Sequence, residues 1–179
     1  MKKLVFATMM CIAAMSAKAQ VLTSETVKNV YEAVLNSSDS KFIYNADFTG
    51  QDITTMYVYR MNVDRRDMLT LTPHMKYDYT YAADGKLTSK VTYHWDDCMN
   101  SWKSTARYDY ALTDGKYIVE YSRYNPAEKC FDQPVDKMVY SLMPYDNNVS
   151  SYHRNDNSSQ FQLISEMQVV DLPVLFAEK

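Results

Sequence analysis

The chain has 179 residues, of which 46% are hydrophobic and 13% aromatic, and it carries a formal net charge of −3 at pH 7. This length is sufficient for one domain with a hydrophobic core. An acidic chain without clusters of basic residues argues against binding to nucleic acid or to an anionic membrane surface, because both depend on Lys and Arg contacts to phosphate groups.

The first nineteen residues have the three parts of a secretory signal peptide. Lys2 and Lys3 give a positive start, residues 4–15 form an apolar run, and Ala17-Lys18-Ala19 supplies small residues for a cleavage site. The apolar run is shorter than the roughly 20 residues of a membrane-spanning helix. We therefore expect cleavage before Gln20 and an exported protein, periplasmic or extracellular, without a transmembrane segment.

Cys11 raises the alternative of a lipid-anchored N-terminus. The residues before it, Thr8-Met9-Met10, lack the small side chains expected next to a lipidated cysteine. The apolar run also continues beyond Cys11. These two observations favour an ordinary signal peptide over a lipoprotein signal.

One amphipathic helix is predicted at about residues 24–36. Ser24 can cap its first turn, and the polar run at residues 36–40 can end it. Apolar side chains recur with the spacing of a single helical face. These side chains are Val27, Val30, Tyr31, Val34 and Leu35.

Beyond residue 40 the apolar period changes from 3.6 to 2, which predicts β-strands. All sixteen tyrosines follow the signal segment, and tyrosine favours strands. Alternation predicts strands at residues 42–48 and 53–61 with a turn at Gly50 between them. The predicted fold is mainly β, a twisted antiparallel meander of roughly eight to ten strands with the helix packed on it, in a single domain of residues 20–179.

An internal repeat gives the strongest signal for β-hairpins. Tyr77-Asp78-Tyr79 is followed by Asp84-Gly85-Lys86, and Tyr108-Asp109-Tyr110 by Asp114-Gly115-Lys116. Asp-Gly between alternating apolar residues is typical of a hairpin turn. A three-residue loop in the first hairpin and a two-residue loop in the second each sort the side chains by face. The predicted pairs are Tyr81–Leu87, Tyr79–Ser89 and Tyr77–Val91, then Leu112–Tyr117, Tyr110–Val119 and Tyr108–Tyr121.

Two tryptophans bracket the loop between these hairpins, and we expect Trp95 to pair with Trp102. That pairing predicts a sheet with one aromatic and one polar face. The aromatic face would hold Val91, Tyr93, Trp95, Trp102, Ala106, Tyr108 and Tyr110. The polar face would hold Asp78, Thr80, Thr88, Lys90, Thr92, His94, Lys103, Thr105, Arg107, Asp109 and Glu120.

A weaker third repeat follows, with strands predicted at residues 138–142, 149–154 and 160–164. In this alignment Cys98 and Cys130 occupy the same inter-strand loop of successive repeats. A disulfide between them and two separate thiols both remain open.

The Tyr-x-Tyr, Asp-Gly-Lys-Leu-Thr and Tyr-x-Trp-Asp motifs resemble the hairpin repeats of small secreted Bacteroidetes proteins of unknown function. Over single hairpins they also resemble the tyrosine-aspartate repeats of large secreted toxin and adhesion shells, with Tyr81, Asp84, Gly85 and Leu87 at the matching positions. The chain is too short to build such a shell. Neither resemblance implies a catalytic residue or a cofactor.

The candidate ligand-binding residues are the aromatic side chains Tyr93, Trp95, Trp102 and Tyr108. Flat aromatic rings with polar neighbours suit a glycan, whereas a sheet must also bury one face, so the same rings could form the core. The expected function is a non-enzymatic binding or adhesion module with a glycan or protein partner. The alternative is a structural or protein–protein interaction component of a surface assembly, with the oligomeric state open.

No catalytic, metal or cofactor site is predicted. The three histidines lack metal-ligand spacing, and the chain has no Gly-x-Ser-x-Gly motif. Asp96 and Asp97 beside the tryptophans leave glycoside hydrolysis by paired carboxylates as a distant third hypothesis. Adjacent loop aspartates are more often turn formers.

Overall fold

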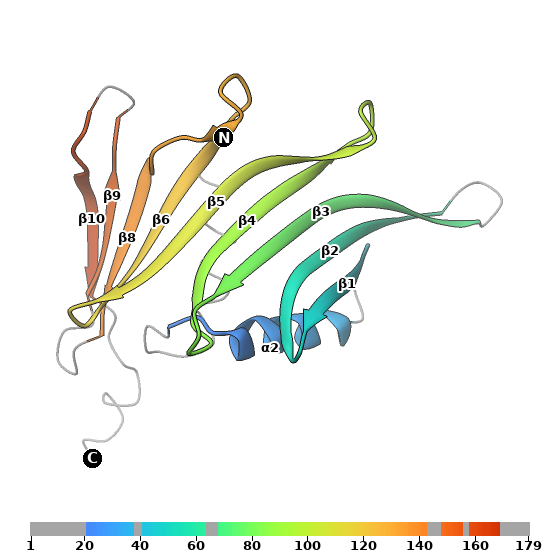
Figure 1. Cartoon of the computed structure of the whole chain (residues 1–179), viewed down its shortest axis with the longest axis horizontal. Helices are drawn as coiled ribbons and strands as arrows, with labels where there is room; N and C mark the ends of the chain where they lie inside the picture. The colour runs from blue at the N-terminus through green and yellow to red at the C-terminus, as the bar shows by residue number, and fades with distance from the viewer. Residues whose placement is uncertain (1–20, 38–40, 64–67, 143–147, 156–157, 169–179) are drawn as a thin grey trace, which may run out of the picture. The chain divides into compact units, whose positions relative to one another are not determined.

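The computed structural model describes residues 21–37, 41–63, 68–142, 148–155 and 158–168 (Figure 1). The predicted signal peptide lies outside these residues. The described chain forms one helix, α2 (Ser24–Leu35). It also forms the strands β1 (Phe42–Thr49), β2 (Asp52–Val63), β3 (Leu69–Tyr81), β4 (Leu87–Asp96), β5 (Ser101–Thr113), β6 (Lys116–Asn125), β7 (Cys130–Phe131), β8 (Asp136–Ser141), β9 (Asn148–His153) and β10 (Gln162–Gln168).

The strands form one antiparallel sheet in which neighbours in space are neighbours in sequence. The order is β1-β2-β3-β4-β5-β6-β8-β9-β10, and the short β7 pairs with β6. The predicted mainly β meander with a single N-terminal helix is therefore confirmed for the described part of the chain. The predicted last strand, residues 160–164, is displaced toward the C-terminus, to residues 162–168.

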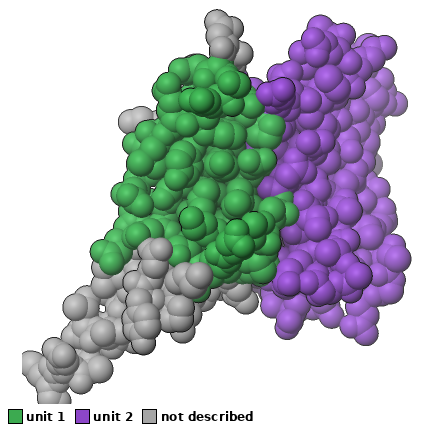
Figure 2. All heavy atoms as spheres, turned by 60° about the vertical axis from the view of Figure 1, so that its left-hand side comes forward, with its two compact units in different colours: residues 1–21, 110–120, 134–179 green, residues 22–109, 121–133 purple. Residues whose placement is uncertain are grey.

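The chain divides into two compact units, which Figure 2 shows in different colours. One unit comprises residues 22–109 and 121–133, and holds α2, β1–β4, most of β5, the second half of β6 and β7. The other includes residues 110–120 and everything described from residue 134 onward. Because β5 and β6 contribute residues to both units, a single domain remains a prediction.

Helix α2 begins with a reciprocal pair of threonine hydrogen bonds. The N-cap is Thr23, one residue before the predicted Ser24: its hydroxyl accepts from the backbone N–H of Thr26 (3.3 Å), and the Thr26 hydroxyl accepts from the backbone N–H of Thr23 (3.3 Å). The same end is attached to the β3–β4 turn, since the Ser24 N–H donates to the Gly85 carbonyl (2.9 Å). Figure 1 shows the helix beside this turn.

Replacing Thr23 with alanine should remove the hydrogen bond that the Thr23 hydroxyl accepts from the Thr26 N–H, and lower the free energy of unfolding by about 1 kcal/mol. The backbone N–H of residue 23 is kept and can still donate to the Thr26 hydroxyl. Urea titration followed by tryptophan fluorescence measures the change, because Trp95 and Trp102 belong to the same unit as α2. The matched control is Thr49→Ala at the exposed end of β1. Equal losses in the two variants would contradict a role for the cap.

The core of this unit lies between α2 and the β1–β2 hairpin. It is centred on Val27, Ile53 and Met56, of which Ile53 is 0% exposed. The hydroxyl of Tyr81 donates to the Ile53 carbonyl (2.8 Å). Further aromatic and small side chains pack around the centre, namely Tyr31, Tyr44, Ala46, Tyr77 and Tyr79. Five of the sixteen tyrosines therefore pack against this core.

The register of the first repeat hairpin differs from the prediction after its first pair. Tyr81 faces Leu87 as predicted, but the register then shifts, so that Tyr79 faces Lys90 and Tyr77 faces Thr92. The predicted partners of Tyr79 and Tyr77 were wrong because the strand pair contains a β-bulge, which adds one unpaired residue and reverses the faces beyond it.

The turn of the second repeat hairpin has the predicted two-residue form. Asp114 and Gly115 are its central residues, with φ angles of 51° and 69°. Two successive positive φ angles are typical of the type I′ turn, whose twist matches that of the flanking strands. An aspartate followed by glycine adopts this backbone at low cost.

Candidate functional site

A second bulge divides the predicted aromatic face. Thr92 faces Ala106 across β4 and β5, whereas the next residue, Tyr93, faces Ser104. Thr105 is therefore the extra residue of the bulge and has no residue opposite it in β4. As a result Tyr93 and the tryptophans project from one face of the sheet and Tyr108 from the other.

The strand register assigns the residues of β2–β5 to these two faces. The helix side, to which the core residues belong, carries Met56, Tyr77, Thr92, Lys90 and Tyr108. The opposite side, here named the outer face, carries Tyr57, Lys76, Asp78, Val91, Tyr93, Trp95, Trp102, Arg107 and Asp109. The predicted separation into an aromatic and a polar face was wrong: both faces are mixed.

Five half-buried rings gather on the outer face, and we call them the outer-face aromatic cluster: Tyr57, Tyr59, Tyr93, Trp95 and Trp102. The predicted tryptophan pair is confirmed, with ring centroids 5.0 Å apart and planes at 70°. The Tyr57 ring lies 6.3 Å from that of Trp102 and 6.4 Å from that of Tyr59. Edge-to-face and offset contacts of this kind fix the rings relative to one another.

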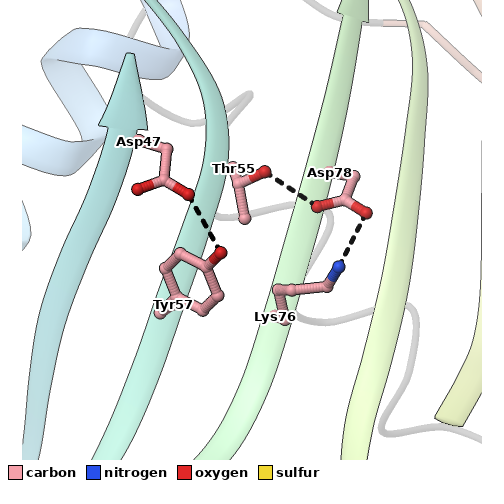
Figure 3. A network of polar contacts seen from close by, with 5 residues as sticks. All are labelled: Asp47, Thr55, Tyr57, Lys76 and Asp78. Carbon is pink, nitrogen blue, oxygen red and sulfur yellow. Dashed lines mark hydrogen bonds and ion pairs between the residues drawn. The ribbon is translucent and has the colours of Figure 1, made fainter. Parts of the chain in front are cut away.

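A network of polar contacts borders the cluster (Figure 3). The Tyr57 hydroxyl donates to an Asp47 carboxylate oxygen (2.9 Å). Asp78 accepts from the Thr55 hydroxyl (3.0 Å) and from the Lys76 ammonium group (2.9 Å). These side chains come from β1, β2 and β3, so neighbouring strands place hydrogen-bonding groups side by side.

Lys76 and Tyr93 connect the network to the aromatic rings. The Lys76 Nζ lies 4.0 Å from the centroid of the Tyr93 ring, a cation–π contact. Burial, followed by the hydrogen bond with Asp78, raises the pKa of Tyr93 to about 12. The hydrogen bond to Asp47, followed by burial, raises the pKa of Tyr57. Both hydroxyls therefore keep their protons at neutral pH and can donate hydrogen bonds.

Tyr108, the fourth predicted ligand-binding residue, is separated from this cluster. Its ring lies on the helix side, 4.5 Å from the Lys90 Nζ and 5.2 Å from the Tyr121 ring. Burial lowers the pKa of Lys90 to about 8. Tyr57, Tyr59 and Asp47 were not predicted as site residues, although the alternation of residues 53–61 places Tyr57 and Tyr59 on a common face.

The loop between the tryptophans has the local contacts of a turn. The Asp96 carboxylate forms an ion pair with Lys103 and accepts from the backbone N–H of Met99 (2.9 Å). These contacts lower the pKa of Asp96. A general acid of a glycosidase requires a raised pKa, so Asp96 is poorly suited to that role.

Neither cysteine forms a disulfide in this structure. Cys98 lies in the β4–β5 turn and Cys130 in β7, and both are exposed free thiols. The described residues contain no group of three or more His, Cys, Asp or Glu side chains arranged to hold a metal ion. Within the same residues, no helix is long and apolar enough to cross a membrane.

A model of a protein family described as "Family of unknown function (DUF3836)" matches residues 1–142. No curated protein matches the chain. Among solved structures, a protein of unknown function from Bacteroides fragilis NCTC 9343 matches with 26% identity and a TM-score of 0.61, over 75% of this chain and 95% of its own.

Two further solved structures come from the same family. A DUF3836 protein from Bacteroides vulgatus ATCC 8482 is 23% identical, with a TM-score of 0.47 over 51% of this chain and 89% of its own. Another from Parabacteroides distasonis ATCC 8503 is 20% identical, with a TM-score of 0.48 over 58% of this chain and 93% of its own.

Proposed function

We propose that this chain, which belongs to the DUF3836 family of unknown function, is an exported, non-enzymatic binding or adhesion module that holds a glycan on its outer-face aromatic cluster. The observation that carries the proposal is the position of this cluster on the face of the sheet opposite α2, directly beside the Asp47–Tyr57 and Thr55–Asp78–Lys76 contacts. The signal-like pattern of residues 1–19 supports export.

The chemistry of this surface suits a sugar. Sugar rings carry C–H groups that pack against aromatic faces, while their hydroxyls need hydrogen-bond partners at the edge of the same surface. Asp47 and Asp78 supply acceptors, and the oxygen of the Tyr57 hydroxyl, whose proton is donated to Asp47, supplies another. The rings are already held by one another, so few rotamers would have to be fixed on binding.

Replacing Trp102 with alanine is expected to weaken glycan binding about thirtyfold, the equivalent of about 2 kcal/mol for a central aromatic contact. An oligosaccharide array identifies a binder, which is then titrated while tryptophan fluorescence is recorded. Trp95 and Trp102 are the only tryptophans of the chain and both lie in the cluster, so the signal comes from the site itself.

Tyr108→Ala serves as the matched control, because it removes a half-buried ring from the opposite face. We expect this variant to bind the glycan as the unmodified protein does, provided that its urea unfolding curve shows a folded protein. The proposal would be contradicted if no oligosaccharide on the array bound, or if Trp102→Ala and Tyr108→Ala weakened glycan binding equally.

A protein–protein assembly role is the second candidate, and the edge strand β10 favours it. Leu163, Ile164 and Met167 are 52–63% exposed on this strand. An exposed edge with apolar side chains can pair with a strand of another chain. Assembly would make the mass in solution depend on protein concentration, whereas a monomeric glycan-binding module would keep a constant mass.

A further inference from the structure

Three nitrogen-bearing side chains meet on the helix side of the sheet, beyond the core. Arg60 of β2 lies 3.4 Å (Nη2 to Nδ1) from His74 of β3, and the His74 ring lies 6.0 Å from that of His94 of β4, at 84°. The ring of Phe42 in β1 stacks against that of His74, with ring centroids 5.2 Å apart and planes at 16°. We refer to Arg60, His74 and His94 as the Arg-His cluster.

This cluster has a local excess of positive charge in a chain with more acidic than basic residues. None of its members forms an ion pair with a carboxylate of the described residues. By contrast, Lys76 pairs with Asp78 and Arg107 with Asp109. Lys103 faces His94 from β5 and forms an ion pair with Asp96.

The hydrogen-bond donors of the cluster are available to a ligand. A guanidinium group always donates, so His74 Nδ1 accepts from Arg60 and the neutral ring keeps its proton on Nε2. Arg60 retains further N–H groups, and His94 adds a donor from a third strand. Arg60 and His94 are exposed and His74 is half-buried, so solvent reaches the cluster.

We propose that the Arg-His cluster binds a tetrahedral oxyanion, a sulfate or phosphate group, and that protonation of its histidines strengthens this binding. Guanidinium and imidazolium donors form short, charge-assisted hydrogen bonds with such oxygens. The site is on the opposite face from the outer-face aromatic cluster, so it does not depend on the proposed glycan site.

The charges around His74 couple the protonation of its ring to the binding of an anion. Burial lowers the pKa of His74, and the charges of Arg60 and His94 lower it further. A bound anion would oppose these two charge effects and favour the imidazolium form. By linkage, the affinity for the anion must then rise as the pH falls.

Inorganic sulfate is the appropriate first probe, because its charge does not change between about pH 5.5 and pH 8, across the range in which histidine titrates. Sulfate is added to the full chain, and the ring-proton resonances of the three histidines are followed by NMR, with sodium chloride at the same ionic strength as the reference. We expect sulfate to shift the signals of His74 and His94. The signals of His153, which pairs with Asp136 (2.6 Å), should not change.

The apparent Kd for sulfate should be at least about fivefold lower at pH 5.5 than at pH 8. Arg60→Gln should raise it about tenfold or more at the lower pH, as expected for loss of a charged donor. Arg107→Gln is the matched control, since that arginine pairs with Asp109 on the outer face. His94→Gln, a second variant, should reduce the pH dependence.

The proposal is overturned if sodium chloride reproduces the shifts, if all three histidines respond equally, or if Arg60→Gln and Arg107→Gln behave alike. A sulfated monosaccharide distinguishes the two sources of the anion. Tighter binding than inorganic sulfate would identify an ester group of a larger ligand, and equal binding would identify the free ion.

Discussion

Replacing Ile53 with alanine is expected to lower the free energy of unfolding by about 3 kcal/mol. Ile53 has no exposed surface and lies at the centre of the packing between α2 and the β1–β2 hairpin. The substitution removes three buried carbon atoms and leaves a cavity that the β-strands can close only in part. Urea titration followed by tryptophan fluorescence measures the loss, because both tryptophans belong to the unit that contains Ile53.

Ile164→Ala gives a control with the same chemical change at a site that is 63% exposed. Its effect should be within about 0.5 kcal/mol, as for most surface substitutions. Because Ile164 belongs to the other unit, its variant is also followed by far-ultraviolet circular dichroism, which reports on all strands. A loss below about 1 kcal/mol for Ile53→Ala would show that α2 and the hairpin do not form a common core.

Above pH 10 the protein is expected to lose stability steeply. Burial raises the pKa of Tyr79 far above its usual value of 10.0, and the neighbouring Tyr77 and Tyr81 raise it further. The unfolded chain then releases the Tyr79 proton near pH 10 while the folded chain retains it. This contribution to stability is complete below pH 10 and is lost at about 1.4 kcal/mol per pH unit above it.

The urea midpoint at about pH 8 and about pH 11 measures this loss, and tyrosinate absorbance shows whether ionisation accompanies unfolding. Burial also raises the pKa values of Tyr77 and Tyr81, so they add to the loss by a smaller amount because they are less enclosed. Tyr79→Phe should be less sensitive to pH than the unmodified chain. Equal sensitivity of the two proteins would mean that the Tyr79 hydroxyl reaches solvent.

The sequence was sufficient to predict the helix and most strands, because their signals are local. The spacing of Val27, Val30 and Tyr31 identifies α2, and alternation identifies β1 and β2. An Asp-Gly dipeptide likewise identifies the turn at Asp114. In each case the residues that decide the structure lie within a few positions of one another.

The faces of the sheet were not predictable, because each depends on single unpaired residues. The bulge at Thr105 has no signal of its own in the sequence, yet it moves Tyr108 to the helix side while Trp102 stays on the outer face. Three of the four proposed ligand residues therefore remain together. Tyr57 joins them through contacts that cross several strands, and alternation within one strand cannot reveal such contacts.

The order of the strands has a consequence for how the chain reaches this structure. From β1 to β6 every strand lies beside the one made just before it, so pairing closes only short loops. Such a topology has a low contact order for a β-protein and should fold rapidly for its class. The same strand order would also allow a hairpin to be added or removed during evolution at the C-terminal end of the sheet, because the connections of the preceding strands would not change.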